Sequence, residues 1–122
     1  MKMQVAWFHR FGEPEEMVLE ETQCPIPGPG EALVRVRATG VNHVDLDVRA
    51  GTARVPIQFP HILGREFAGE VAALGSAGGA FKEGDRVWVA SRLACGQCEF
   101  CWTGRDNLCA HGHFFGMGLP GG

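Results

Sequence analysis

The chain has 122 residues and a mass of 13.2 kDa, enough for one compact domain but not for a substrate domain together with a separate dinucleotide-binding domain. Its formal charge of -3, with both signs interspersed, excludes the basic stripe of a nucleic-acid-binding protein. No apolar run is long enough to span a membrane, and acidic residues come before any signal-peptide core, so we expect a cytoplasmic protein. The 18 glycines and 7 prolines favour a turn-rich β architecture with few, short helices.

The first half of the chain predicts strands separated by turns. Residues 2–8 and 17–21 form a predicted strand pair, and residues 24–30 follow as a loop because their prolines and glycines cannot sustain a hydrogen-bonded ladder. Residues 31–41 alternate between apolar and polar, which predicts a half-buried strand. Its apolar face consists of Ala32, Val34, Val36 and Ala38.

One helix is expected, and it follows that strand. Asn42 is a suitable N-cap, apolar side chains then recur at helical spacing, and Gly51 supplies the stop. Beyond the helix, residues 67–74 and 86–90 are predicted strands with a glycine-rich turn at residues 75–79 between them. The pattern is mainly β with one short helix.

Four of the five cysteines crowd into a segment of fifteen residues. In a reducing compartment this crowding favours metal binding over disulfides. Two-residue spacers let three successive thiolates surround one cation, and a longer segment of seven residues brings back a fourth thiolate. The pattern therefore predicts a closed, structural zinc site. Arg92 and Arg105, together with backbone amides, are expected to compensate the thiolate charge. The predicted ligands are Cys95, Cys98, Cys101 and Cys109.

Other interpretations of this segment remain. An iron–sulfur cluster also uses cysteines two residues apart, but the ferredoxin run continues with three residues and Cys-Pro, whereas this chain has seven residues and Cys-Ala. His111 or His113 is an acceptable zinc ligand in place of one cysteine, although four thiols already satisfy the ion. Cys24 stands apart from the pattern and is most simply an unligated thiol.

Three further motifs accompany the cysteine spacing. They are Ala38-Thr-Gly-Val-Asn-His-Val-Asp-Leu46, Pro60-His-Ile-Leu-Gly-Arg-Glu-Phe-Ala-Gly69 and Gly84-Asp-Arg-Val87. Together they resemble the medium-chain dehydrogenase/reductase superfamily, which includes zinc-type alcohol dehydrogenases and quinone oxidoreductases. The resemblance covers residues 1–122 and implies the amino-terminal GroES-like domain, a partly open β-barrel, incomplete at its carboxyl end. It also implies that residues 91–113 form the structural zinc lobe.

The sequence departs from the zinc-dependent members at the positions of their catalytic zinc ligands. The resemblance places Asn42 where those enzymes carry a cysteine and Arg65 where they carry a histidine. An amide is a poor zinc donor, and a guanidinium has no acceptor lone pair and repels a dication. Val44 replaces their proton-relaying hydroxyl residue. We therefore expect no catalytic zinc.

The same resemblance implies roles for four other residues. Asp45 is similar to the carboxylate that orients the ligand histidine, so here it is expected to pair with Arg65, with Glu66 close by. Arg65 would then supply a fixed positive charge that polarises a substrate carbonyl. His43 resembles the position that approaches the cofactor pyrophosphate. In the alternative interpretation, Asn42 is only a helix cap, Asp45 lies in the first turn of that helix, Arg65 is exposed and His43 is only a surface residue.

We expect no cofactor-binding Rossmann domain within residues 1–122. Residues 116–121 match G-x-G-x-x-G, but the chain ends at Gly122 and no helix follows to hold a pyrophosphate, so we reject this match. The expected function is that of a module of an NAD(P)-dependent oxidoreductase acting on alcohols, aldehydes, enones or quinones. The alternative is a non-catalytic zinc-binding GroES-like protein, or a truncated fragment, that makes protein contacts through its open sheet edge. The third alternative is a zinc module that binds nucleic acid, which the net charge disfavours.

Overall fold

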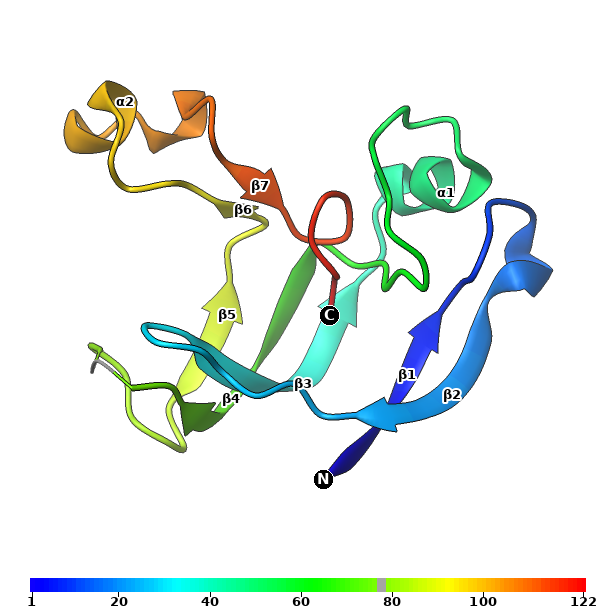
Figure 1. Ribbon diagram of the computed structural model, residues 1–122, viewed down its shortest axis with the longest axis horizontal. Helices are drawn as coiled ribbons and strands as arrows, with labels where there is room; N and C mark the ends of the chain where they lie inside the picture. Colours follow the sequence, from blue (N-terminus) through cyan, green and yellow to red (C-terminus); the bar gives the residue numbers. More distant parts are fainter. Residues whose placement is uncertain (77–78) are drawn as a thin grey trace.

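The computed structural model describes residues 1–76 and 79–122, and it confirms the mainly β fold. In this described part, three small antiparallel sheets succeed one another, and the cysteine lobe with α2 projects from one end (Figure 1). The first sheet pairs β1 (Lys2–Trp7) with β2 (Val18–Gln23). The second has the strand order β3 (Ala32–Gly40), β4 (Glu66–Leu74), β5 (Arg86–Val89). The third pairs β6 (Arg92–Leu93) with β7 (His113–Phe114).

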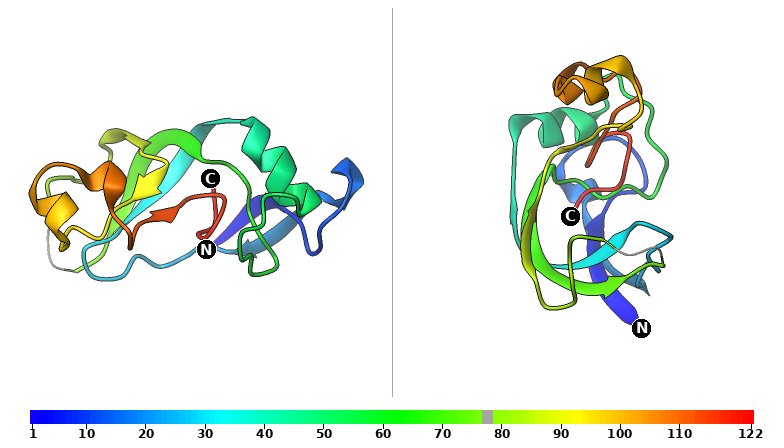
Figure 2. Two further views of the ribbon diagram at one scale, coloured as in Figure 1. Left: turned by 90° about the horizontal axis from the view of Figure 1, so that it is seen from above. Right: turned by 90° about the vertical axis from the view of Figure 1, so that its left-hand side faces the viewer.

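The central sheet is curved, as the arc of β4 in Figure 2 shows. Two register shifts against β4, at Leu33/Val34 and at Val36/Ala38, break the side-chain alternation of β3. The prediction of a half-buried β3 with one clean apolar face was therefore wrong: Val36 is 40% exposed, and most of the strand is open to solvent. The predicted turn at residues 75–79 includes Ala77 and Gly78, which lie outside the described residues.

Helix α1 (His43–Ala50) begins after Asn42 and ends at Gly51, whose φ of 81° is readily adopted by glycine. The expectation of a single helix was wrong. The structure adds α2 (Glu99–Trp102), where the amide of Trp102 donates to the carbonyl of Cys98 at 3.0 Å, and two 3₁₀ turns. These turns are Pro14–Glu16 and Asp106–Leu108. No helix in the described part of the chain has the length and apolarity needed to cross a membrane.

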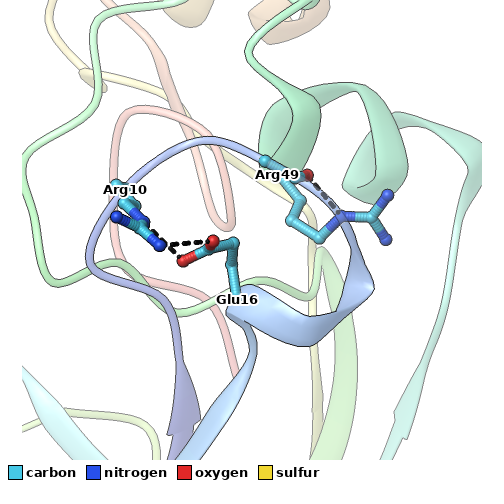
Figure 3. A network of polar contacts seen from close by, with 4 residues as sticks. Arg10, Glu16 and Arg49 are labelled. Atoms are coloured by element: carbon cyan, nitrogen blue, oxygen red, sulfur yellow. Dashed lines mark hydrogen bonds and ion pairs between the residues drawn. The ribbon is translucent and has the colours of Figure 1, made fainter.

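The loop between β1 and β2 is held against α1. The guanidinium of Arg10 donates to both carboxylate oxygens of Glu16, at 2.8 and 2.9 Å. Beside this ion pair, Arg49 Nε donates to the carbonyl of Gly12 at 3.1 Å, and the Gly12 amide donates back to the Arg49 carbonyl (Figure 3). These contacts set the position of α1, the helix that carries His43 and Asp45.

The core is small and opens onto a hollow. Phe8, fully buried, packs edge-on against Phe59 and His61. The chain exposes 8348 Å², roughly 1,900 Å² more than a compact monomer of this mass. A cavity of about 950 Å³ lies between β1, β3, α1 and the carboxyl-terminal tail. The described residues thus surround an incompletely filled interior.

The glycines of the tail allow close backbone packing. The amide of Gly121 donates to the carbonyl of Ile62 at 2.8 Å, and a Cβ on Gly116 would lie 2.6 Å from the carbonyl oxygen of Gly64. A Cβ on Gly121 would collide with the Leu63 carbonyl. The G-x-G-x-x-G match of residues 116–121 thus serves packing against residues 62–64.

Candidate metal centre and substrate corner

The cysteine lobe is built on the two-stranded ribbon of β6 and β7 (Figure 1). Between these strands the chain turns at Gly96, with φ 71°, runs through α2, and turns again at Gly104, with φ 72°. Both values lie in the left-handed region, which glycine adopts without a steric penalty. The turns bring the four thiols to one point in the lobe.

The geometry of the four thiols fits a single zinc ion. All four Sγ atoms lie within 4.8 Å of one another. The Sγ of Cys101 lies 3.9 Å from that of Cys95 and 3.6 Å from that of Cys98. With Zn–S bonds of about 2.3 Å, a tetrahedral site needs sulfur–sulfur edges of about 3.8 Å. The donor set therefore matches a mononuclear tetrathiolate site and leaves no open position for substrate.

Backbone amides and burial affect the thiols in opposite directions. The Cys95 amide points at the Cys109 Sγ, 3.4 Å away, and this hydrogen bond is the main reason that the pKa of Cys109 is lowered to about 6. Desolvation, with a further contribution from the Cys98 thiol, raises the pKa of Cys101 to about 11. A bound dication stabilises all four groups as thiolates and displaces their protons.

The other sulfur and imidazole groups stay outside this cluster. His111 and His113 are exposed, and Cys24 lines the cavity and is not part of the cluster. Among the described residues, the four predicted cysteines are the only group of His, Cys, Asp or Glu side chains close enough to share a metal ion. Four sulfurs this near one another surround one ion, not the larger body of an iron–sulfur cluster.

Asn42 and Arg65, the two residues at the expected catalytic-zinc positions, flank one end of the central sheet. Gly40 at the end of β3 is directly paired with Glu66 at the start of β4. Asn42 follows the first and Arg65 precedes the second. We call this end the substrate corner, after the role that the family resemblance implies for it.

Asp45 has a different partner from the one predicted. Its carboxylate accepts hydrogen bonds from the amides of Asn42, at 2.8 Å, and Gly64, at 3.2 Å, and the residue is 3% exposed. The predicted Asp45–Arg65 ion pair was wrong, because in the described residues Asp45 is satisfied by backbone donors. Asp45 ties the start of α1 to the segment that leads into Arg65.

Arg65 stacks on an aromatic ring that the sequence did not suggest. Its guanidinium carbon lies 4.7 Å from the centre of the Phe114 ring on β7, and its Nε is buried with no hydrogen-bond partner in the described residues. The neighbouring Glu66 side chain is exposed on the outer face of the sheet. His43 is exposed too, with Nε2 3.9 Å from the Asp47 carboxylate. The structure thus brings Arg65 together with Phe114, not with Asp45.

Sequence reasoning missed Phe114 and Gly64 as parts of this corner. Phe114 belongs to a two-residue strand, too short to show a periodicity. Gly64 has a φ of 104°, and a Cβ there would collide with the Gly122 carbonyl. The available signal was its position immediately before Arg65, in a segment otherwise without glycine from residue 52 to residue 63.

Comparison with known proteins agrees with this description. Residues 28–122 match the family model "Alcohol dehydrogenase GroES-like domain". The chain is 42% identical over 122 residues to an alcohol dehydrogenase of Rhizobium meliloti, covering 99% of this chain and 35% of that protein. It is 44% identical over 116 residues to D-altritol 5-dehydrogenase of Agrobacterium fabrum, covering 93% of this chain and 33% of that protein.

Solved structures give the same result. The cobalt- and zinc-bound thermostable alcohol dehydrogenase of Pyrobaculum aerophilum superposes with a TM-score of 0.92 at 40% identity, covering 100% of this chain and 37% of that chain. The present chain thus spans about a third of the length of the relatives it matches. With its mainly β fold and its cluster of four thiols, the chain belongs to the alcohol dehydrogenase GroES-like domain family.

Proposed function

We propose that this chain is the amino-terminal, substrate-side module of an NAD(P)-dependent oxidoreductase and that it binds one structural zinc ion. The observation that carries the proposal is the convergence of four thiols, with spacings suited to one tetrahedral ion, in a chain of the GroES-like family. Zinc in the lobe stabilises the fold and takes no part in turnover, because the four thiols close its coordination.

The substrate corner does not bind a second, catalytic zinc in this proposal. Asn42 offers a weak neutral oxygen, and the fixed positive charge of Arg65 opposes a dication. Val44 has no hydroxyl to pass on a proton. Hydride transfer then depends on orienting the substrate and on hydrogen-bond donors near its carbonyl oxygen.

Arg65 is the residue best suited to supply positive charge at this corner. The Phe114 ring fixes the orientation of its guanidinium, and the Asp45–Gly64 contact fixes the backbone immediately before it. We assign Glu66 the role of partly offsetting the positive charge of this corner. Asp45 supports the corner by accepting hydrogen bonds from the backbone amides of Asn42 and Gly64. His43, exposed at the start of α1, is proposed to approach the cofactor phosphates.

The nicotinamide cofactor supplies or accepts the hydride when it is bound by the complete enzyme. The relatives are dehydrogenases, so an alcohol or a carbonyl compound is the proposed substrate class. Four thiols kept reduced for metal binding support a cytoplasmic location. The open cavity supports contact with further polypeptide, either of the same enzyme or of another copy.

A chimaeric enzyme tests the proposal. Residues 1–122 replace the matching third of the Rhizobium meliloti alcohol dehydrogenase, and metal content and NAD(P)-dependent turnover are measured. We expect turnover with the lobe zinc alone, and about a 100-fold loss in Arg65→Met. The paired change Asn42→Cys with Arg65→His should create a second metal site. A second metal ion in the unaltered chimaera would contradict the absence of a catalytic zinc site. Unchanged turnover in Arg65→Met would contradict the proposed role of Arg65.

A further inference from the structure

Arg92 joins the base of the cysteine lobe to its far end. It lies on β6, directly across from Phe114 on β7. Its Nη1 donates to the carbonyl oxygen of Asn107 at 2.7 Å, and its Nη2 donates to the carbonyl oxygen of Cys109. One planar group therefore holds two carbonyls of the short segment that presents the fourth thiol.

Cys109 is the ligand most in need of such a contact. It reaches the cluster after seven intervening residues, whereas Cys95, Cys98 and Cys101 are separated by two. It follows the 3₁₀ turn of residues 106–108, whose last carbonyls have no partner within the turn. The rigid fork of an arginine suits two carbonyls at once, and a lysine ammonium does not reproduce that geometry.

The local packing keeps the Arg92 guanidinium in this position. Its Cζ lies 5.2 Å from the centre of the Phe114 ring. Gly112 lies so close that a Cβ there would be 2.8 Å from Arg92 Nε and 3.1 Å from Nη2. A side chain at residue 112 would therefore push the fork away from its carbonyls.

Arg105 provides an internal comparison. It carries the same charge in the same lobe, but its side chain is exposed, its Nε donates to Thr103 Oγ1 at 3.2 Å, and its Cζ lies 5.3 Å from the Phe100 ring centre. These contacts hold no part of the Cys109 segment. If only charge were important, replacing either arginine would weaken zinc binding. If the hydrogen-bond geometry is important, only the replacement of Arg92 weakens it.

We propose that Arg92 is a positioning residue for the zinc site, which pre-organises Cys109 by bridging the carbonyls of Asn107 and Cys109. This inference rests on the proposed function, because it requires that the four thiols bind a metal ion. Such supporting contacts lower the ordering cost of binding, and their loss typically weakens metal affinity by about 10–100-fold.

The test is a zinc competition titration against a chromophoric chelator, made on the 122-residue chain. Arg92→Met should weaken zinc binding by about 10–100-fold. Arg105→Met, the matched removal of one charge, should leave the affinity unchanged. Arg92→Lys should rescue only part of the loss, and Gly112→Ala, which keeps the arginine, should lie between wild type and Arg92→Met. Cobalt substitution gives a second readout, since its absorption bands report tetrahedral thiolate coordination, which should be distorted in Arg92→Met and unchanged in Arg105→Met.

The outcomes separate the two proposals. A wild-type chain that binds no zinc overturns the proposed function. A wild-type chain that binds zinc, with Arg92→Met equal to Arg105→Met, overturns the role of Arg92 alone. If circular dichroism shows that Arg92→Met does not fold, the test depends on Arg92→Lys and Gly112→Ala. Wild-type zinc affinity in both of these variants would contradict the inference.

Discussion

The guanidinium of Arg65 lies over the ring of Phe114, with its central carbon 4.7 Å from the ring centre. The contact joins the start of β4 to β7, at the base of the cysteine lobe. Arg92 shares the same ring, so one aromatic side chain contacts both the substrate corner and the residue proposed to position the metal site.

Replacing Phe114 by leucine should therefore destabilise the zinc-loaded chain. The change removes two cation–π contacts and part of the ring's packing, at a cost of about 1–3 kcal/mol. Urea unfolding monitored by circular dichroism measures the effect. Phe100→Leu, which loses one such contact at an exposed arginine, is the control and should cost less. Equal losses in the two variants would show that Phe114 has no special role.

Asp45→Asn should destabilise the chain although it changes the shape of the side chain very little. The carboxylate accepts hydrogen bonds with both oxygens, whereas the amide of asparagine turns a donor toward one of the two backbone amides. An unsatisfied buried donor costs about 1–3 kcal/mol. Asp47→Asn on the same helix is the control, and its unfolding midpoint in urea should stay close to that of wild type. No difference between the two would argue against the anchoring role of Asp45.

Gly64→Ala should be far more harmful than Gly84→Ala. Both glycines have positive φ, 104° and 89°, so both substitutions incur backbone strain of about 1–2 kcal/mol. Only Gly64 faces a collision, with the carbonyl of Gly122, whereas nothing lies within 4 Å of a Cβ at Gly84. The difference in thermal midpoint between the two variants isolates the packing of the tail. Equal midpoints would mean that this close packing does not contribute to stability.

The carboxyl group of Glu16 should titrate below its ordinary pKa of 4.5, chiefly because it accepts hydrogen bonds from Arg10. A folded-state pKa below the unfolded value means that the pair contributes stability above pH 4.5 and that this contribution is lost as the pH falls through the lowered pKa. NMR titration of the side-chain carboxyl measures it. In Arg10→Met the Glu16 pKa should return toward 4.5, while the pKa of Glu20, lowered mainly by its hydrogen bond from Trp7, should stay where it is. A Glu16 pKa that does not respond would contradict the pairing.

Local signals in the sequence were sufficient for the metal site and for most strands. The spacing of Cys95, Cys98 and Cys101 fixes three ligands within one short segment, so the chemistry can be inferred without the fold. The cap at Asn42 and the glycine at residue 51 delimit α1 correctly, because helix ends depend on neighbouring residues.

Contacts between distant segments were beyond such reasoning. Asp45 is bound by Gly64, nineteen positions along the chain, and Arg65 by Phe114 on a strand of two residues. The irregular exposure of β3 arises from its register shifts against β4, which alternation alone does not reveal. Helix α2 is a single short turn inside the metal-binding loop, with too few residues to show a period.

Metal analysis of the purified chain tests the central claim most directly. Elemental analysis after dialysis against a weak chelator should give about one zinc per chain in wild type and in Arg65→Met, and almost none in Cys101→Ser, in which one of the four thiolates is lost. A wild-type chain without metal would contradict the structural zinc site. Two zinc ions per chain, one of which is lost when Asn42 or Arg65 is replaced, would contradict the claim that the substrate corner binds no metal.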